Sequence, residues 1–201
     1  MSLNFSRFAT LAIVLITALL LGACEREPVG RNDPPPPREL RMVFPNFSLK
    51  ALPWGEWKIE QGNRDRMVVS KAQGKSLMRL RAEEFRLEAM PDGGSFTEAA
   101  EAREEQAMSD LQMLSAHYDT AVLSGADCLR YDGIYRDPRK AGSADEFLNR
   151  KGYVCQHPTR PGIAAQVDFS VRSPTRSPPD IEQMLRQADA VMDTVEFVPV
   201  R

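Results

Sequence analysis

The chain has 201 residues, of which 27% are charged and 42% hydrophobic, and its formal net charge is −2 at pH 7. This length supports one domain with a substantial hydrophobic core. A slightly acidic chain with mixed charges lacks the clustered basic surface that nucleic-acid binding needs, so we expect no nucleic acid among its partners.

An apolar run near the amino terminus predicts a secretory signal peptide. Arg7 is the one positive charge before apolar residues 8–21, and the small residues Gly22 and Ala23 follow. The run is shorter than the ~20 residues of a membrane-spanning helix, and it ends in small residues that a signal peptidase accepts. Residues 1–23 are therefore predicted to be removed, which leaves 178 residues.

A cysteine follows this segment directly. The tetrapeptide Leu21-Gly22-Ala23-Cys24 resembles the lipobox of bacterial lipoproteins. The resemblance implies that the Cys24 thiol carries a diacylglycerol, that cleavage falls before it, and that the new amine is acylated with a fatty acid such as palmitate. Two or three acyl chains on one residue hold a domain to a bilayer. The alternative is an ordinary secreted protein with a cysteine near the cleavage site by chance.

The residue after the cysteine bears on membrane sorting. In sorting of the enterobacterial kind, an Asp at this position retains a lipoprotein in the inner membrane, and here the residue is Glu25. The resemblance therefore favours the periplasmic leaflet of the outer membrane over the inner membrane. We expect a domain that faces the periplasm and is tethered to the membrane through the lipid on Cys24.

Residues 24–43 are predicted to be a linker, and residues 44–201 a single domain. The linker is rich in charge, proline and glycine and has no apolar periodicity. Its four consecutive prolines, Pro34 to Pro37, favour a stiff polyproline II segment of roughly 12 Å, at ~3.1 Å per residue. This segment would lift the domain off the lipid surface.

The first half of the domain is predicted to hold short strands and then a helix. Residues 57–59 and 67–70 are strand candidates around a polar turn, and imperfect alternation over 76–88 indicates a strand with a bulge. Ser95 and Glu98 form a capping box before a predicted amphipathic helix over 96–117. We interpret the charged face of this helix as solvated surface: Glu98, Glu101, Arg103, Glu104 and Glu105.

The second half is predicted to hold long strands and a final helix. Residues 120–137 indicate one long strand, residues 138–149 a loop, and residues 150–173 two more strands around the turn HPTRPG. Ser177 is the expected cap of the last helix, and Pro178 and Pro179 occupy its first positions. The apolar face of that helix contains Ile181, Met184, Leu185, Ala188, Val191, Met192 and Val195. A short strand, residues 195–199, follows.

The two remaining cysteines predict a disulfide. Cys128 and Cys155 form an even pair in an oxidising compartment. If their strands form one hairpin, pairing them centres the turn between Ala141 and Gly142, within the most turn-like segment. Opposed residues of an antiparallel pair lie about 4.5–5.5 Å apart, which a disulfide permits. A reactive or metal-binding thiol is the competing interpretation.

The search for catalytic chemistry is negative. His117 and His157 are the only histidines, and Cys155 with His157 falls short of a four-ligand zinc site. The chain has no Gly-x-Ser-x-Gly elbow and no glycine-rich phosphate loop, and its adjacent carboxylate pairs diverge. We therefore predict no metal, no cofactor and no enzymatic activity, with an unrecognised hydrolase as an alternative.

Three features are candidates for binding. Tyr131 and Tyr135 share one face of their predicted strand, and this row is either an aromatic patch for a partner or part of the core, as alternation favours. His157 and Arg160 lie in HPTRPG, which is either a rigid protruding turn or an ordinary hairpin turn. A basic stretch could meet an acidic partner or be a solvated loop: Arg136, Arg139, Lys140, Arg150 and Lys151.

The order of elements predicts an α+β fold, an antiparallel sheet with two amphipathic helices packed on it. Over residues 44–199 the layout resembles the PsbP and DcrB-like lipoprotein fold. The resemblance is carried by residues 44–59, by residues 123–137 with Gly125 leading into a strand, and by the last helix running into Phe197. The cysteine pair and the HPTRPG turn depart from that pattern. The resemblance implies a binding or assembly protein without catalysis.

The sequence therefore predicts a lipid-anchored, non-catalytic binding protein that acts with another protein of the envelope in its maintenance or assembly. An immunity lipoprotein that neutralises a toxin delivered to the periplasm, such as a type VI secretion effector, is the alternative from another class.

Overall fold

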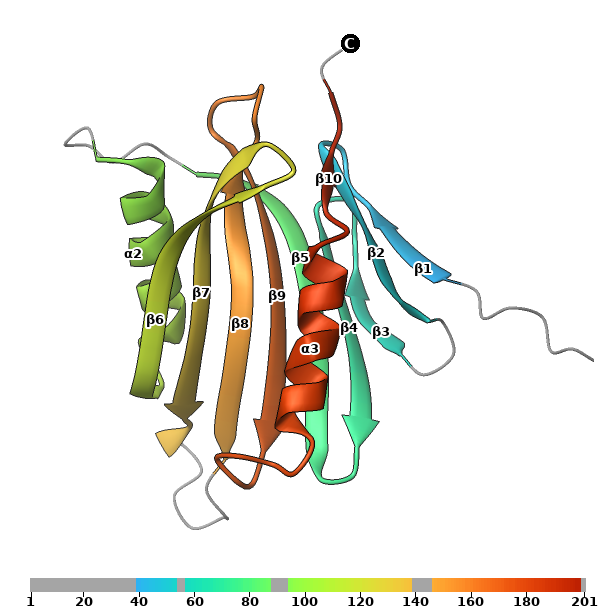
Figure 1. Ribbon diagram of the computed structural model, residues 1–201, viewed down its shortest axis with the longest axis vertical. Coiled ribbons are helices and arrows are strands. Elements are labelled where there is room, and N and C mark those ends of the chain that lie inside the picture. The colour runs from blue at the N-terminus through green and yellow to red at the C-terminus, as the bar shows by residue number, and fades with distance from the viewer. Residues whose placement is uncertain (1–38, 54–56, 88–93, 139–145, 200–201) are drawn as a thin grey trace, which may run out of the picture. The chain divides into compact units, whose positions relative to one another are not determined.

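The computed structural model describes residues 39–53, 57–87, 94–138 and 146–199. Over these residues the chain forms two antiparallel sheets and two helices, an α+β fold as predicted (Figure 1). The larger sheet has the strand order β3-β4-β5-β9-β8-β7-β6, and the smaller one β1-β2-β10. The predicted signal peptide, Cys24 and the four prolines lie outside the described residues. No helix of the described part is long and apolar enough to cross a membrane.

The elements have the following bounds. The strands are β1 (Glu39–Val43), β2 (Phe47–Pro53), β3 (Lys58–Gly62), β4 (Arg66–Gln73), β5 (Ser76–Arg86), β6 (Gln112–Leu123), β7 (Ala126–Arg136), β8 (Phe147–Gln156), β9 (Ile163–Ser173) and β10 (Glu196–Phe197). The helices are α2 (Phe96–Met108) and α3 (Ile181–Met192). The last residues of the predicted linker, 39–43, form strand β1. Met42 is fully buried and β1 pairs with β2, so these residues belong to the folded domain.

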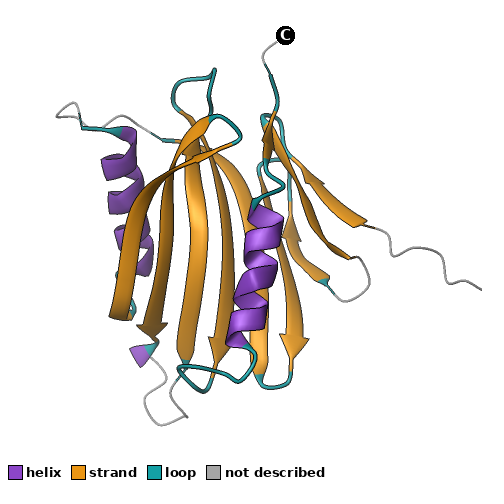
Figure 2. Ribbon diagram, viewed as in Figure 1, coloured by secondary structure: helices purple, strands orange, loops and turns teal. Residues whose placement is uncertain are grey.

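Two helices cover opposite faces of the larger sheet (Figure 2). Helix α3 and the smaller sheet enclose the main apolar core on one face. Its fully buried large side chains are Met42, Phe47, Leu49, Val69, Met78, Leu80, Phe169, Val171 and Met192. Burial of each large apolar side chain contributes about 1.5–3 kcal/mol, so this face supplies most of the hydrophobic stabilisation. Helix α2 covers part of the other face.

The first helix is shorter than the predicted 96–117. The capping box of Ser95 and Glu98 is present, but the helix ends at Met108, and the N–H of Ser109 donates to the Gln106 carbonyl at 3.3 Å. The residues after it form β6, which pairs with β7 along its whole length. The apolar spacing of residues 111–118 fits a helix or a strand, and the neighbouring strand decided between them.

The predicted long strand over 120–137 is a hairpin of β6 and β7. Ser124 and Gly125 have φ angles of 51° and 77°, which is the conformation of a two-residue type I′ turn. Gly125 therefore makes the turn itself. The sequence analysis gave residues 112–117 of β6 to the helix and residues 120–123 to one strand with β7. It therefore predicted three long strands after α2 where the structure has four.

Two further expectations are corrected. Strand β5 has no bulge, because its register with β4 and β9 runs without a shift. Its alternation is imperfect because residues on both of its faces are buried. The cap of α3 is Asp180 rather than Ser177, and Asp180 makes no side-chain capping bond. Pro178 instead contributes its carbonyl, which accepts from the Ile181 N–H at 3.1 Å.

Candidate functional site

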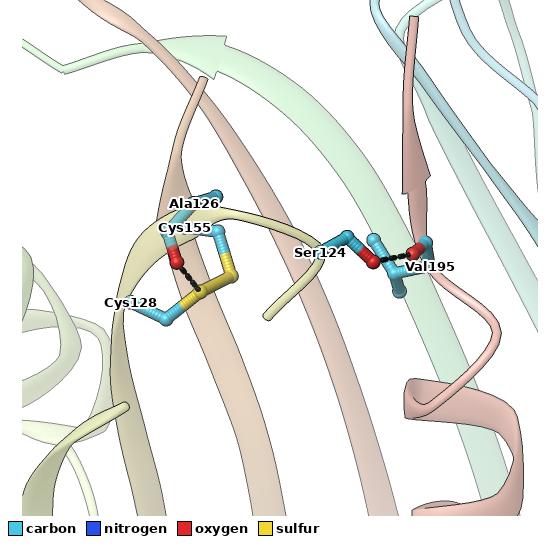
Figure 3. The surroundings of a disulfide bond; sticks show 5 residues. All are labelled: Ser124, Ala126, Cys128, Cys155 and Val195. Carbon is cyan, nitrogen blue, oxygen red and sulfur yellow. Dashed lines mark hydrogen bonds between the residues drawn. A yellow bond between two sulfur atoms is a disulfide. The ribbon is translucent and has the colours of Figure 1, made fainter. Parts of the chain in front are cut away.

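Cys128 and Cys155 form a disulfide between β7 and β8 (Figure 3). The two residues are directly opposite in the strand register, and their Cα atoms lie 4.0 Å apart. Both are buried, with 1% and 2% of their surface exposed. A bonded cysteine is not available as a metal ligand or nucleophile, so the thiol interpretation fails for this pair. The predicted turn centre, between Ala141 and Gly142, lies outside the described residues.

A hydrogen bond fastens the neighbouring hairpin turn. The Ser124 hydroxyl donates to the Val195 carbonyl at 2.5 Å, beside the disulfide in Figure 3. Val195 follows α3 and leads into β10. The β6–β7 turn, the β7–β8 disulfide and the end of the last helix are therefore joined at one end of the large sheet.

A cleft open to solvent lies at this same end of the sheet. It has a volume of about 570 Å³ and adjoins a second cleft of about 310 Å³ that shares Asp127 and Gln156 with it. We name the two together the disulfide-end cleft. Its walls are Ser95, Phe96, Thr97, Thr120, Ala121, Val122, Gly125, Asp127, Cys128, Gln156, His157, Pro158, Thr159 and Pro161. The exposed Asp127 carboxylate and the Gln156 amide give it hydrogen-bonding capacity.

His157 is a buried residue of the β8–β9 turn. Only 3% of its surface is exposed. Its Nδ1 accepts from the Thr159 N–H at 3.2 Å, so the ring proton is assigned to Nε2. The ring meets Phe197 edge to face, with centroids 5.5 Å apart, and Nε2 has no hydrogen-bond partner. His157 therefore packs the turn against β10 and does not protrude from it.

Arg160 ties the same turn to the smaller sheet. Its guanidinium donates to the Asn46 side-chain oxygen. Asn46 in turn donates from its backbone N–H to Glu84 at 2.9 Å. HPTRPG is thus an ordinary hairpin turn anchored on both sides, and binding of a partner by His157 or Arg160 stays a prediction.

Tyr131 and Tyr135 are buried, each with 4% of its surface exposed. They are therefore part of the interior, as their alternation favoured, and the alternative of an aromatic patch for a partner is wrong for these two residues. Tyr131 packs over Gly152, where an added Cβ would come within 2.5 Å of the Tyr131 hydroxyl. Glycine at this position lets the aromatic ring cross the neighbouring strand and reach polar groups beneath α2.

Those polar groups form a charge cluster between α2 and the sheet. We use this name for Arg81, Glu83, Arg103, Glu104, Tyr131, Arg150, Gln166 and Asp168. Arg150 is its centre: one guanidinium nitrogen lies 2.6 Å from Glu104 and the other 3.2 Å from Asp168. The Tyr131 hydroxyl accepts from Arg150 at 3.1 Å. Side-chain exposure is 4% for Arg150, 1% for Glu104 and 6% for Asp168.

Further hydrogen bonds extend the cluster across four strands. The fully buried Gln166 amide donates to Glu104 at 2.6 Å and to the Tyr131 hydroxyl at 3.0 Å. Arg103 of α2 donates to Gln166 at 2.7 Å and to Glu83 at 2.9 Å. Arg81 donates to Asp168 at 2.5 Å. Three arginines thus face three carboxylates, so the formal charges of the cluster balance.

The cluster favours the charged forms of Asp168 and Arg150. Burial alone would raise the pKa of Asp168, but Arg150 and Arg81 outweigh it and keep that pKa below its ordinary value. Burial likewise opposes the charge on Arg150, yet Asp168, Tyr131 and Glu104 raise its pKa. The pKa of Tyr131 is raised, first by burial, so its hydroxyl stays protonated. These directions describe a set of mutually satisfied groups.

The sequence carried a signal for this cluster that our interpretation missed. Glu104 lies four residues after Ala100 and eight after Phe96, on the stripe of α2 that faces the sheet. We had placed it on the solvated face. In β5 and β9, Arg81, Glu83, Gln166 and Asp168 alternate with apolar residues, so they share one face. An alternating polar face usually meets water, and only the position of α2 showed otherwise.

No group of three or more potential metal ligands occurs among the described residues. The basic stretch is also divided by the fold. Arg150 is buried in the charge cluster, whereas Lys151 points to the other face and pairs with Asp189 of α3 at 2.5 Å. Arg139 and Lys140 lie outside the described residues. The described part of this stretch is therefore not one basic surface.

Comparison with known proteins identifies no family. No protein-family model matches the sequence, and no curated protein matches it. Solved structures share parts of the arrangement at low similarity. LpqN of Mycobacterium tuberculosis, involved in cell envelope biogenesis, is 11% identical with a TM-score of 0.45, over 81% of this chain and 92% of that one. A Pseudomonas aeruginosa protein of unknown function is 14% identical with a TM-score of 0.43, over 77% and 92%.

A third solved structure, from Bacteroides thetaiotaomicron, is 14% identical with a TM-score of 0.41. The match covers 76% of this chain and 45% of that one, so this chain spans less than half of its length.

Proposed function

We propose that this protein is a lipid-anchored binding protein of the bacterial cell envelope, and that it acts with an envelope component in maintenance or assembly. The tetrapeptide ending at Cys24 supports the lipid anchor and the location in the cell envelope. The folded domain supports a binding role, because some of its polar groups line a cleft that solvent reaches.

The observation that carries the proposal is the contrast between the charge cluster and the disulfide-end cleft. The ionisable groups that converge on one another, around Arg150, are buried and paired among themselves. The cleft that solvent reaches presents Asp127 and Gln156 on a rim held by the disulfide and the anchored turns. An open cleft that offers both polar and apolar groups, with its rim tied down by the disulfide and by hydrogen bonds, suits recognition of a partner, since less conformational entropy is lost on binding to an anchored surface.

The anchor is tested by mass spectrometry of the mature chain isolated from membranes. We expect an amino terminus at Cys24 that carries a diacylglyceryl group and an amide-linked acyl chain. The Cys24→Ala variant should leave the membrane fraction. An unmodified Cys24 in a chain released to the soluble fraction would contradict the anchor.

The partner is tested by affinity capture of the tagged, full-length chain from crosslinked envelopes. Asp127→Lys alters the cleft, and Asp132→Lys is the matched control, an exposed carboxylate of the same strand that does not line the cleft. We expect an outer-membrane or peptidoglycan assembly factor with the wild type and the control. Asp127→Lys should reduce its capture.

Other outcomes of this capture would replace the proposal. A single stoichiometric secreted hydrolase would establish an immunity lipoprotein instead. If the Asp127→Lys variant captures the partner as well as the wild type does, the binding surface lies outside the disulfide-end cleft. Hydrolysis of an envelope polymer by the purified chain would contradict a non-catalytic role.

A further inference from the structure

Strand β6 is a long free edge of the larger sheet. Among the described strands it pairs with β7 alone, and it is twelve residues long. Most of its residues are exposed or half-buried, including Val122 at 73% and Met113 at 49%. An edge of this kind presents unpaired backbone N–H and C=O groups to any strand that approaches.

The other free edges of the described sheets are shorter than β6, and β10 has only two residues. Strand β3 has five residues, carries Lys58 and Glu60, and has a register shift at Ile59. Strand β1 also has five residues, carries Arg41, and has a register shift beside it. Short length, charge and bulges are the usual means of blunting an edge. Strand β6 has a register shift between Met113 and Ser115 and one carboxylate, Asp119. The seven residues from Ser115 to Ala121 contain no lysine, no proline and no register shift, so a longer regular edge remains there than on β1 or β3.

The residues of β6 complement themselves when the strand is reversed. Within one chain, His117 Nε2 lies 2.8 Å from the Asp119 carboxylate on the same face of β6. About a centre at Tyr118, His117 also faces Asp119 of an antiparallel copy, so the same two groups can exchange partners across the interface, and Tyr118 faces Tyr118. The outer pairs are Ala116 with Thr120 and Ser115 with Ala121. The outer pairs consist of small side chains, the central pair is aromatic, and His117 with Asp119 is a pair of complementary polar groups. No two like charges face each other. One strand placed against its own copy thus satisfies every position of this segment.

The backbone has the phase that this pairing needs. In a two-residue hairpin the closing pair, Leu123 and Ala126, exchanges hydrogen bonds, and exchange then alternates along the strand. Tyr118 therefore points its N–H and C=O away from β7, as do Ala116 and Thr120. Two copies centred on Tyr118 can form about six interchain hydrogen bonds through these three residues.

We propose that the protein forms a two-fold symmetric dimer by antiparallel pairing of β6 with β6 of a second copy, centred on Tyr118. The occupant is a second copy because this register makes the segment self-complementary. The dimer extends two seven-stranded sheets into one. The dimer shares Thr120 and Ala121 with one wall of the disulfide-end cleft. It requires neither the lipid at Cys24 nor a partner at Asp127, so it can fail while the proposed function stands.

The register is tested by disulfide trapping in cells that co-express two differently tagged full-length chains, one with His117→Cys and the other with Asp119→Cys. These positions face each other in a non-hydrogen-bonded pair, about 4.5 Å apart at Cα, which permits a disulfide. We expect a product with both tags at a yield at least about fivefold above the controls, because the control positions exceed bonding distance. The controls are His117→Cys in both chains, and Lys58→Cys with Glu60→Cys on the β3 edge.

The pairing of His117 with Asp119 is tested by sedimentation of the full-length chain in detergent. Asp119→Lys should weaken dimerisation by roughly tenfold, since symmetry breaks two pairs at once and lysine blunts the edge. The exchanged variant His117→Asp/Asp119→His should dimerise like the wild type. Both residues are exposed, so the variants should unfold at the wild-type temperature.

A wild-type chain that stays monomeric at every concentration would overturn the proposal. So would equal trapping of the two β6 pairs and the β3 pair, or disulfide bonding of the β6 cysteines to another protein. Failure of the exchanged variant to dimerise, with its fold intact, would also overturn the register at Tyr118.

Discussion

The two faces of the large sheet are buried by different means. The α3 face is a continuous apolar core, in which Leu80 and Phe169 are fully buried among aliphatic and aromatic neighbours. Beneath α2 the sheet instead presents the charge cluster, with Arg150 between Glu104 and Asp168. Apolar burial is non-directional and tolerates exchange at constant volume. Buried charges require every partner in place, so the α2 face should be more sensitive to single changes.

The largest difference between the faces is expected from Arg150→Met. It leaves buried Glu104 with only the longer arginine contact, to Arg103 at 3.5 Å, and Asp168 with Arg81 alone. The loss should cost about 3–5 kcal/mol of unfolding free energy. Urea denaturation measures the loss. Arg186→Met is the control, because Arg186 is 70% exposed and should change stability by no more than about 0.5 kcal/mol. Equal effects of the two variants would show that the cluster is not stabilising.

The disulfide lies on the α3 side of the sheet, and its removal should rank next. Replacing Cys128 and Cys155 by alanine releases a loop with a sequence separation of 27 residues. The chain-entropy account gives a loss of about 3–4 kcal/mol. Thermal and urea unfolding of the double variant measure it, and Cys24→Ala should unfold like the wild type. If a reducing agent left the stability of the unfolded-and-refolded wild type unchanged, the assignment of a stabilising disulfide between Cys128 and Cys155 would be wrong.

Lowering the pH should reduce the stabilisation that comes from the α2 face more than that from the apolar α3 face. The pKa of Asp168 is lower in the folded chain than its ordinary 3.8. Its contribution to stability is therefore complete above the unfolded value and is lost as pH falls through the folded value. Urea titrations in this acidic range should show a smaller dependence of unfolding free energy on pH for Asp168→Asn than for the wild type. An unchanged pH slope would contradict the role of this carboxylate.

Conservative exchanges should give the smallest effects and the sharpest contrast. Leu80→Met, on the α3 face, keeps volume and polarity and should cost less than about 1.5 kcal/mol. Arg150→Lys keeps the charge but cannot contact Glu104 and Asp168 with one planar fork, so it should cost more than Leu80→Met. Urea denaturation of both variants under the same conditions gives their unfolding free energies and shows which exchange costs more. The reverse order would show that the charge cluster is as adaptable as the apolar core.

Local patterns predicted much of the fold. The capping box of α2, the apolar stripe of α3 and the alternation in β9 are encoded by neighbouring residues, and the structure has all three elements. The opposed positions of Cys128 and Cys155 follow from counting along one hairpin. Helix length, by contrast, was wrong after Met108, because residues 111–118 fit two periodicities and the pairing with β7 chose the strand.

The sequence by itself determined the class of the fold and the cysteine pairing, and the anchor at Cys24 stays a prediction from the sequence. Each of these depends on residues close in the chain or on simple spacing. Only the tertiary structure decided which polar residues are buried. Glu104 reaches Arg150 and Gln166 because α2 crosses the sheet at that place, and Tyr131 joins them because its neighbour is Gly152. Charge pairing across distant elements requires their positions in space, which no local pattern specifies.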